Sequence, residues 1–145
     1  MAEENRPAIL ARGLVRTFGA VRALDGLDLE VAGQRILGLL GPNGSGKTTF
    51  IRVLAGLLRP TSGEVLVLGR RPGLGTAPHV GYMTQAPALY DDLPARDNLV
   101  FFGRLFGLSR SEAGARADEL LELVSLTQKA RTPVLFGVSG TAVVT

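Results

Sequence analysis

Polar and apolar residues partly alternate over the beginning of the chain, and this alternation predicts two antiparallel strands. Residues 9–18 set apolar side chains between arginine and threonine, and residues 23–31 set leucine and valine between aspartate and glutamate. A strand points successive side chains to opposite faces, so a period of two indicates a sheet with one solvated face. Gly19 and Ala20 are predicted to turn the chain between the two strands.

A wholly apolar run at residues 36–40 breaks the alternation and predicts a short strand that is buried on both faces. Further along, apolar residues recur at helical spacing, which predicts a helix that reaches about Leu58 before Pro60 stops it. Two more short strands are predicted at residues 64–68 and 80–84, with a loop rich in glycine and proline between them.

The pattern becomes helical after Leu93. Residues 97–106 form one candidate helix, and Ser109 with Glu112 predicts a capping box at the start of a second. The order of strands, loop and helix, strands, and then helices predicts an α/β fold.

Composition narrows the class of protein. The chain has 145 residues, 46% of them hydrophobic and 20% charged, which is typical of one globular domain. Cysteine is absent, and the one histidine, His79, has no acidic neighbour at ligand spacing, so a metal role is not expected. No apolar run is long enough for a signal peptide or a membrane span, so we expect a soluble or peripheral protein. The formal net charge of +3 comes from scattered arginines, and nucleic-acid binding is therefore not expected.

The strongest chemical signal is the stretch 41–49, GPNGSGKTT, which fits the phosphate-loop pattern G-x-x-x-x-G-K-[ST]. Its glycines permit a tight turn whose backbone N–H groups surround a triphosphate, and the following helix adds the positive end of its dipole. Lys47 is predicted to bind the β- and γ-phosphates, and the Thr48 hydroxyl is predicted to coordinate Mg²⁺. The alternative is a glycine-rich turn with an exposed lysine. The predicted nucleotide-binding residues of the loop are Gly41, Pro42, Asn43, Gly44, Ser45, Gly46, Lys47, Thr48 and Thr49.

Three stretches around the loop resemble the ATP-binding subunit of ABC transporters, and the resemblance covers roughly residues 8–134. Phe18 with residues 23–27 is similar to the family's aromatic loop, residues 54–64 are similar to the run after the phosphate loop, and residues 81–85 are similar to the strand that ends in the Q-loop glutamine. The resemblance implies an ABC-type P-loop NTPase core with an N-terminal antiparallel β subdomain and a partial helical subdomain.

The resemblance also implies roles for two residues outside the loop. Phe18 is expected to stack its ring on adenine, and the alternative is a phenylalanine that packs in the core. Gln85 is expected to help hold Mg²⁺ and the attacking water and to lie where a transmembrane partner docks, and the alternative is a solvated strand end. Gln85 and Lys47 are then the candidate catalytic residues, with ATP and Mg²⁺ as the cofactors.

The whole chain, residues 1–145, is expected to be the N-terminal part of an ABC-type ATP-binding domain. Within it, residues 8–94 would form the β and P-loop core, residues 95–128 the helical subdomain, and residues 135–145 an atypical tail. Residues 89–108 resemble the branch that works with drug, antibiotic or lipid exporters, which implies an energy-coupling role in export. The implied partners are a transmembrane permease and a second ATP-binding subunit. The implied location is the cytoplasmic face of the membrane, or the cytoplasm if the chain is unpartnered.

The ending departs from the family pattern. A signature of the form L-S-G-G-Q is expected soon after residue 134, and Ser139-Gly140 resembles only its middle. No run of four apolar residues followed by Asp-Glu occurs after Gln85. We therefore expect a truncated or frame-disrupted subunit, incomplete as a catalyst, whose phosphate-loop strand has an exposed apolar edge.

Three alternatives stay open at this point. They are an ATP-binding remnant without catalysis, a phosphate-loop protein of another class such as a GTPase, and a soluble ABC ATPase that acts on DNA or ribosomes. The guanine-reading sequence N-K-x-D, which a GTPase needs, does not follow the loop.

Overall fold

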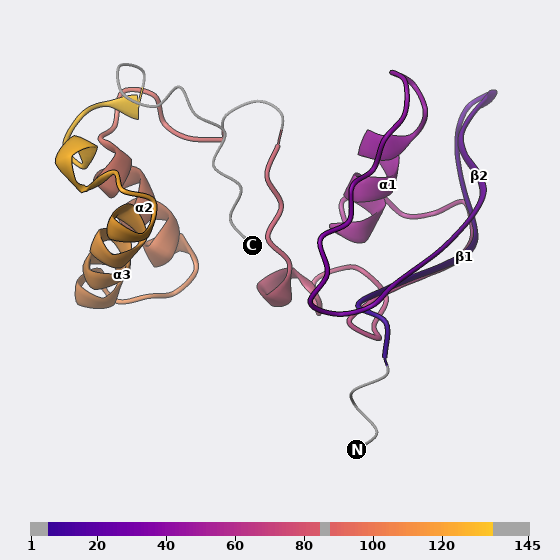
Figure 1. The fold of residues 1–145 in the computed structure, drawn as a ribbon, viewed down its shortest axis with the longest axis horizontal. Coiled ribbons are helices and arrows are strands. Elements are labelled where there is room, and N and C mark those ends of the chain that lie inside the picture. The colour runs from indigo at the N-terminus through magenta and orange to yellow at the C-terminus, as the bar shows by residue number, and fades with distance from the viewer. Residues whose placement is uncertain (1–5, 85–87, 135–145) are drawn as a thin grey trace. The chain divides into compact units, whose positions relative to one another are not determined.

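The computed structural model describes residues 6–84 and 88–134. The chain divides into two compact units, Met1–Met83 and Thr84–Thr145 (Figure 1). Among the described residues, the first unit holds a β-sheet and one α-helix and the second holds a pair of α-helices, so the predicted α/β class is confirmed.

The finer division into residues 8–94, 95–128 and 135–145 stays a prediction, and its last segment lies outside the described residues.

The sheet of the first unit consists of β1 (Ile9–Phe18), β2 (Val21–Val31) and β3 (Ser62–Val67). All pairings are antiparallel and the order is β2-β1-β3, so β1 is the central strand. The two strands predicted before the loop are confirmed. Their alternating pattern gives the sheet one apolar face, on which Leu14 is fully buried.

Helix α1 (Lys47–Leu54) packs on this apolar face. The predicted helix end near Leu58 is wrong, because Gly56 takes a φ of +74° and the Leu57 N–H turns back to the Arg52 carbonyl (2.9 Å). The strands and the helix together bury one apolar cluster: Ala11, Leu14, Leu24, Phe50, Val53 and Val65.

The predicted strands at residues 36–40 and 80–84 are wrong, because both segments are irregular. Ile36 is 92% exposed and Leu40 is 96% exposed, so the run is not buried on both faces. A strand of that kind needs hydrogen-bonded neighbours, and no strand among the described residues pairs with either segment. Leu39 is the one residue of the run that packs against the apolar cluster of the first unit.

The second unit is built on α2 (Ala95–Leu105) and α3 (Arg110–Leu123), which pack against each other. The predicted capping box at the start of α3 is confirmed. The Glu112 N–H donates to the Ser109 hydroxyl (3.3 Å), and the Ser109 N–H donates to the Glu112 carboxylate (2.9 Å). Hydrogen bonding to its carboxylate lowers the pKa of Glu112, first from the Ser109 side chain and then from the Ser109 backbone N–H.

A buried amide fixes the loop before α2. Asn98 is 1% exposed; its side-chain oxygen accepts from the Tyr90 N–H (2.8 Å) and its nitrogen donates to the Tyr90 carbonyl (2.9 Å). Residues 130–134 pass beside this loop, where the Val134 N–H donates to the Leu93 carbonyl (3.2 Å). The start of α2 is thus held from both sides.

Two short 3₁₀ turns complete the elements, Ala77–His79 in the first unit and Thr127–Lys129 in the second. In the part of the chain that the structure describes, every helix is too short or too polar to cross a membrane.

Candidate nucleotide-binding site

The glycine-rich stretch forms a compact turn that leads directly into α1. The Ser45 N–H donates to the Pro42 carbonyl (3.3 Å), which closes the turn, and the Phe50 N–H donates to the Gly46 carbonyl (2.8 Å), which opens the helix. Gly44 and Gly46 take φ values of +84° and +88°. Residues that carry a side chain rarely adopt such backbone angles, so the glycines are what allow this turn.

The last glycine of the loop lies directly against strand β2. A Cβ atom added at Gly46 would lie 2.4 Å from the Ala23 carbonyl oxygen and 3.0 Å from Leu24 Cδ2. No carbon reaches a backbone oxygen at that distance, so only glycine fits. The contact fixes the end of the phosphate loop on the sheet.

Lys47 lies over the loop rather than out in solvent. Its ammonium group donates to the carbonyls of Gly41 (2.7 Å) and Pro42 (2.7 Å) and to the Ser45 hydroxyl (3.2 Å). An ammonium group has three protons, so these three acceptors satisfy it. The arrangement holds the positive charge beside the loop's backbone amides, whereas an exposed lysine on a plain turn would extend away.

The start of α1 is prepared for an anion. Gly46 at the N-cap supplies no side-chain acceptor, and the first turn contains no acidic residue. The first N–H groups of a helix have no acceptor within it, and they carry the positive end of its dipole. Thr48 is exposed in this first turn and Thr49 is half-buried. The remaining predicted residues Gly41, Pro42, Asn43 and Gly44 are exposed in the turn.

Phe18 ends β1, opposite Val21 on β2, and is 44% exposed, so it is not a core phenylalanine. Val21 precedes Leu24, the residue beside Gly46, by three positions on the same strand. A strand rises about 3.3 Å per residue, so the ring lies about 10 Å along the strand from the loop contact. Base and phosphates of one nucleotide are separated on this scale.

Gln85 lies outside the described residues, so its predicted place beside the site stays a prediction. Arg16 is the residue near the site that the sequence analysis missed. Its guanidinium lies over the Phe18 ring, 4.5 Å from the centroid. Two residues apart on one strand face the same side, and an arginine two positions before an exposed aromatic was the available signal.

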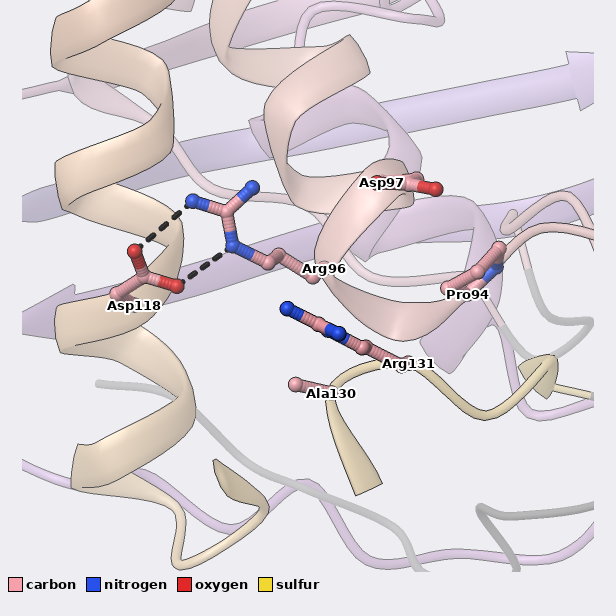
Figure 2. A pocket seen from close by; sticks show the side chains of 6 residues that line it. All are labelled: Pro94, Arg96, Asp97, Asp118, Ala130 and Arg131. Atoms are coloured by element: carbon pink, nitrogen blue, oxygen red, sulfur yellow. Dashed lines mark hydrogen bonds and ion pairs between the residues drawn. The ribbon is translucent and has the colours of Figure 1, made fainter. Parts of the chain in front are cut away.

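A second concave region belongs to the second unit and is lined by Pro94, Arg96, Asp97, Asp118, Ala130 and Arg131 (Figure 2). Arg96 and Asp118 form a bidentate pair, with Nε to Oδ1 at 2.6 Å and Nη2 to Oδ2 at 2.9 Å. The hydrogen bonds of this pair raise the pKa of Arg96 and lower that of Asp118. This ion pair therefore joins α2 to α3.

Metal-ligating side chains do not gather anywhere in the described ranges, since no three His, Cys, Asp or Glu residues lie close enough to share an ion. Among the described residues, the Thr48 hydroxyl is the predicted protein ligand for a divalent cation at the phosphate loop, beside the oxygens of a bound phosphate chain; the other predicted ligand, Gln85, lies outside the described residues. That donor set, all oxygen, is the kind that Mg²⁺ prefers.

Comparison with known proteins identifies the family. The model of the ABC transporter family matches residues 24–141, which is most of the chain. The chain belongs to the ABC transporter family. This ABC chain is 45% identical over 130 residues to the daunorubicin resistance ATP-binding protein DrrA3 of Streptomyces coeruleorubidus, covering 88% of its own length and 41% of the relative's.

Other relatives of the ABC chain have similar names. It is 39% identical over 133 residues to the doxorubicin resistance ATP-binding protein DrrA of Mycobacterium tuberculosis, with 88% of this chain and 40% of the relative covered. It is also 39% identical over 135 residues to the probable multidrug ABC transporter ATP-binding protein YbhF of Escherichia coli, with 89% and 23% covered. The ABC chain thus spans about two fifths or less of the length of these relatives.

Solved structures confirm the predicted P-loop NTPase fold of the ABC type. The crystal structure of the ADP conformation of MJ1267, an ATP-binding cassette of an ABC transporter, superposes with a TM-score of 0.76 at 22% identity. The match covers 93% of the ABC chain and 60% of that structure. A nucleotide-free ATP-binding cassette from an ABC transporter gives a TM-score of 0.75, also at 22% identity, with 91% and 59% covered.

Proposed function

We propose that this chain binds Mg-ATP at residues 41–49 and acts as the energy-coupling, ATP-binding part of an ABC exporter. The observation that carries the proposal is the position of Lys47, whose ammonium lies over the loop (2.7 Å from the Gly41 carbonyl) beside an uncapped helix N-terminus. A positive charge, free amides and a helix dipole converge there, and a triphosphate is the ligand that uses all three.

Each residue type in the loop has a separate task in this proposal. The backbone amides of residues 43–49 surround the phosphates, and Lys47 exchanges one of its loop acceptors for the β- and γ-phosphate oxygens. The Ser45 hydroxyl is its most distant acceptor, at 3.2 Å, and the one whose loss leaves both carbonyl contacts intact. The Thr48 hydroxyl faces the metal. Bound Mg²⁺ would neutralise phosphate charge and hold the phosphate chain in one geometry.

For turnover, Lys47 and Gln85 are the proposed catalytic residues. Lys47 would stabilise the charge that develops on the transferred phosphoryl group, and Gln85 would orient the attacking water. Phosphoryl transfer needs an oriented nucleophile as well as positioned charge. We expect the chain on its own to bind ATP well and to hydrolyse it slowly.

The export role is supported by the relatives, three of which carry names for drug resistance or multidrug transport. In this role the chain works with a transmembrane permease and pairs with a second ATP-binding subunit at the cytoplasmic face of the membrane. An exposed aromatic pair, Tyr90 from the loop before α2 and Phe101 within α2, gives the second unit an apolar surface for contacts. The two rings lie edge to face, 5.1 Å between centroids, and both residues are more than two fifths exposed.

Calorimetric titration of the purified chain with Mg-ATP tests the binding step. We expect saturable binding that requires Mg²⁺, and Lys47→Ala should weaken it at least about tenfold, since it removes a charge-assisted contact. The matched control is Lys129→Ala, which removes the chain's other lysine. Absence of binding by the wild type, or equal affinity of both lysine variants, would contradict the proposal. GTP binding as tight as ATP binding would favour the GTPase alternative.

The export role needs a cellular measurement. Cells that make this chain are loaded with daunorubicin, the compound in the name of one relative, and its retention is followed by fluorescence. If the chain couples ATP to export, the Lys47→Ala variant should retain more compound than wild type. Equal retention of daunorubicin and of a panel of other drugs would argue for a role outside export.

A further inference from the structure

We propose that Arg16 is a positioning residue that sets the Phe18 ring for base stacking and links it to the segment after the phosphate-loop helix. The proposal rests on the function proposed above, because it concerns how the same site receives the base of ATP. The proposal is based on the contacts of Arg16, which connect the Phe18 ring with the segment that follows the phosphate-loop helix.

Arg16 covers one face of the ring. Its guanidinium carbon lies 4.5 Å from the Phe18 centroid, within the range of a cation–π contact. Phe18 is nevertheless 44% exposed. The exposed part of a ring that carries a planar guanidinium on one face is available to a second planar group, such as a purine.

The guanidinium is itself anchored. Arg16 Nη1 donates to the Arg59 carbonyl at 2.9 Å, while Arg16 Nε is buried without a hydrogen-bond partner. Leaving a buried N–H unpaired costs free energy, so the side chain is held in this position by its other contacts. Those contacts are the Arg59 carbonyl and the Phe18 ring.

The anchor lies on the chain just after the phosphate-loop helix. Arg59 follows α1, and the neighbouring Thr61 hydroxyl accepts from the Thr17 N–H at 3.0 Å. The Thr61 N–H donates in turn to the Val15 carbonyl at 2.8 Å. The end of β1 that carries Phe18 is therefore tied to residues 59–61 by hydrogen bonds on both sides of Arg16.

The strand register completes the connection. Arg16 pairs with Leu24 across β1 and β2, and Leu24 is the side chain that contacts Gly46 of the loop. Arg16 thus stands between the place where the phosphates bind and the ring on which the base stacks. A change at Arg16 should alter recognition of the base and leave recognition of the phosphates intact.

Calorimetry with two ligands on the full chain tests this assignment. Mg-ATP has a base, and Mg-tripolyphosphate has the phosphates alone. We expect Arg16→Met to weaken Mg-ATP binding about threefold to tenfold and to leave tripolyphosphate binding unchanged, since a cation–π contact has about this strength. Arg16→Lys should fall between, because lysine keeps the charge but loses the planar group. The matched control is Arg12→Met, an exposed arginine of the same strand, which should bind both ligands as wild type does.

A double variant shows whether Arg16 acts through the ring. Phe18→Ala should weaken Mg-ATP binding more than Arg16→Met does, and the variant with both changes should bind no more weakly than Phe18→Ala alone. Equal loss for both ligands in Arg16→Met would reveal a merely structural role and overturn the assignment, as would unchanged ATP affinity. Failure of the wild type to bind Mg-ATP would overturn the proposed function, and this inference with it.

Discussion

The hairpin of β1 and β2 forms paired strands as the sequence predicts, whereas the apolar run at residues 36–40 forms no strand. Both were expected to be strands. The hairpin forms, and Ile9 pairs with Val31 while Phe18 pairs with Val21. The run stays irregular, with Ile36 and Leu40 more than nine tenths exposed.

The two segments differ in whether a strand that can pair with them lies close along the chain. The hairpin's partners are joined by Gly19 and Ala20, so closing the pair restricts little of the chain. The run has no hydrogen-bonded neighbour among the described residues, although it is wholly apolar. An apolar run favours burial of a segment, but it does not identify the partner strand that would bury it.

The largest expected effect is on the free energy of unfolding, when one apolar side chain in each region is replaced by alanine. Leu14→Ala removes a fully buried side chain of β1 and should lower the free energy of unfolding by about 2–5 kcal/mol. Ile36→Ala, in the run, should change it by less than about 0.5 kcal/mol, because that side chain is 92% exposed. Denaturant unfolding followed by circular dichroism measures both. A large cost at Ile36 would show that the run is packed in solution.

The phosphate loop offers a second comparison, between two glycines. Gly46→Ala should cost about 2 kcal/mol, because the new methyl group meets the Ala23 carbonyl at 2.4 Å and the φ of +88° is strained. It should also abolish tripolyphosphate binding. Gly38→Ala, in the apolar run, has open space around the added carbon and should leave stability and binding unchanged. Similar behaviour of the two variants would mean that the loop does not rest on β2.

A third, smaller effect concerns association rather than folding. The double variant Ile36→Ser, Leu40→Ser should stay monomeric at concentrations where wild type self-associates, because an unpaired apolar segment attracts copies of itself. Its free energy of unfolding should stay within about 0.5 kcal/mol of wild type. Leu74→Ser, at a position 96% exposed in the first unit, is the control for removing one isolated apolar side chain. Light scattering at matched concentrations decides whether the run or general surface hydrophobicity drives association.

The smallest effect tests the most local feature, the capping box of α3. The folded pKa of Glu112 is lowered, so its stabilisation is present above the ordinary carboxyl pKa of about 4.3 and is lost as the pH falls through the folded value. Glu112→Gln should therefore melt slightly lower than wild type at pH 7 and should lose less stability on going to pH 3. Glu122→Gln, at an exposed position of the same helix, should keep the wild-type pH dependence. Thermal melts at both pH values measure this difference.

Sequence patterns predicted the features whose partners are close along the chain. The hairpin, the capping box of Ser109 and Glu112, and the turn that opens α1 all follow from residues within a short span. The end of α1 was missed because the prediction placed the stop at Pro60, whereas Gly56, with a φ of +74°, already ends the helix as a local cap. The anchoring of Arg16 could not be read from a local pattern, since Arg59 is distant in sequence.

The candidate site was predictable to the same extent. The motif at residues 41–49 identifies the loop, because its backbone turn and the helix behind it are local. The rest of the site depends on which strand the loop rests against. The contact of Gly46 with Ala23 is set by the tertiary fold, and a one-dimensional pattern cannot express it.

The central position of β1 also orders events during synthesis. One edge of β1 is filled by β2 almost as soon as the hairpin emerges, but the other waits for β3, where Ile9 meets Val67. Everything from the apolar run through α1 must be made before that second edge closes. A ribosome-bound chain that ends short of β3 would thus carry a half-finished sheet whose central strand has one unpaired edge.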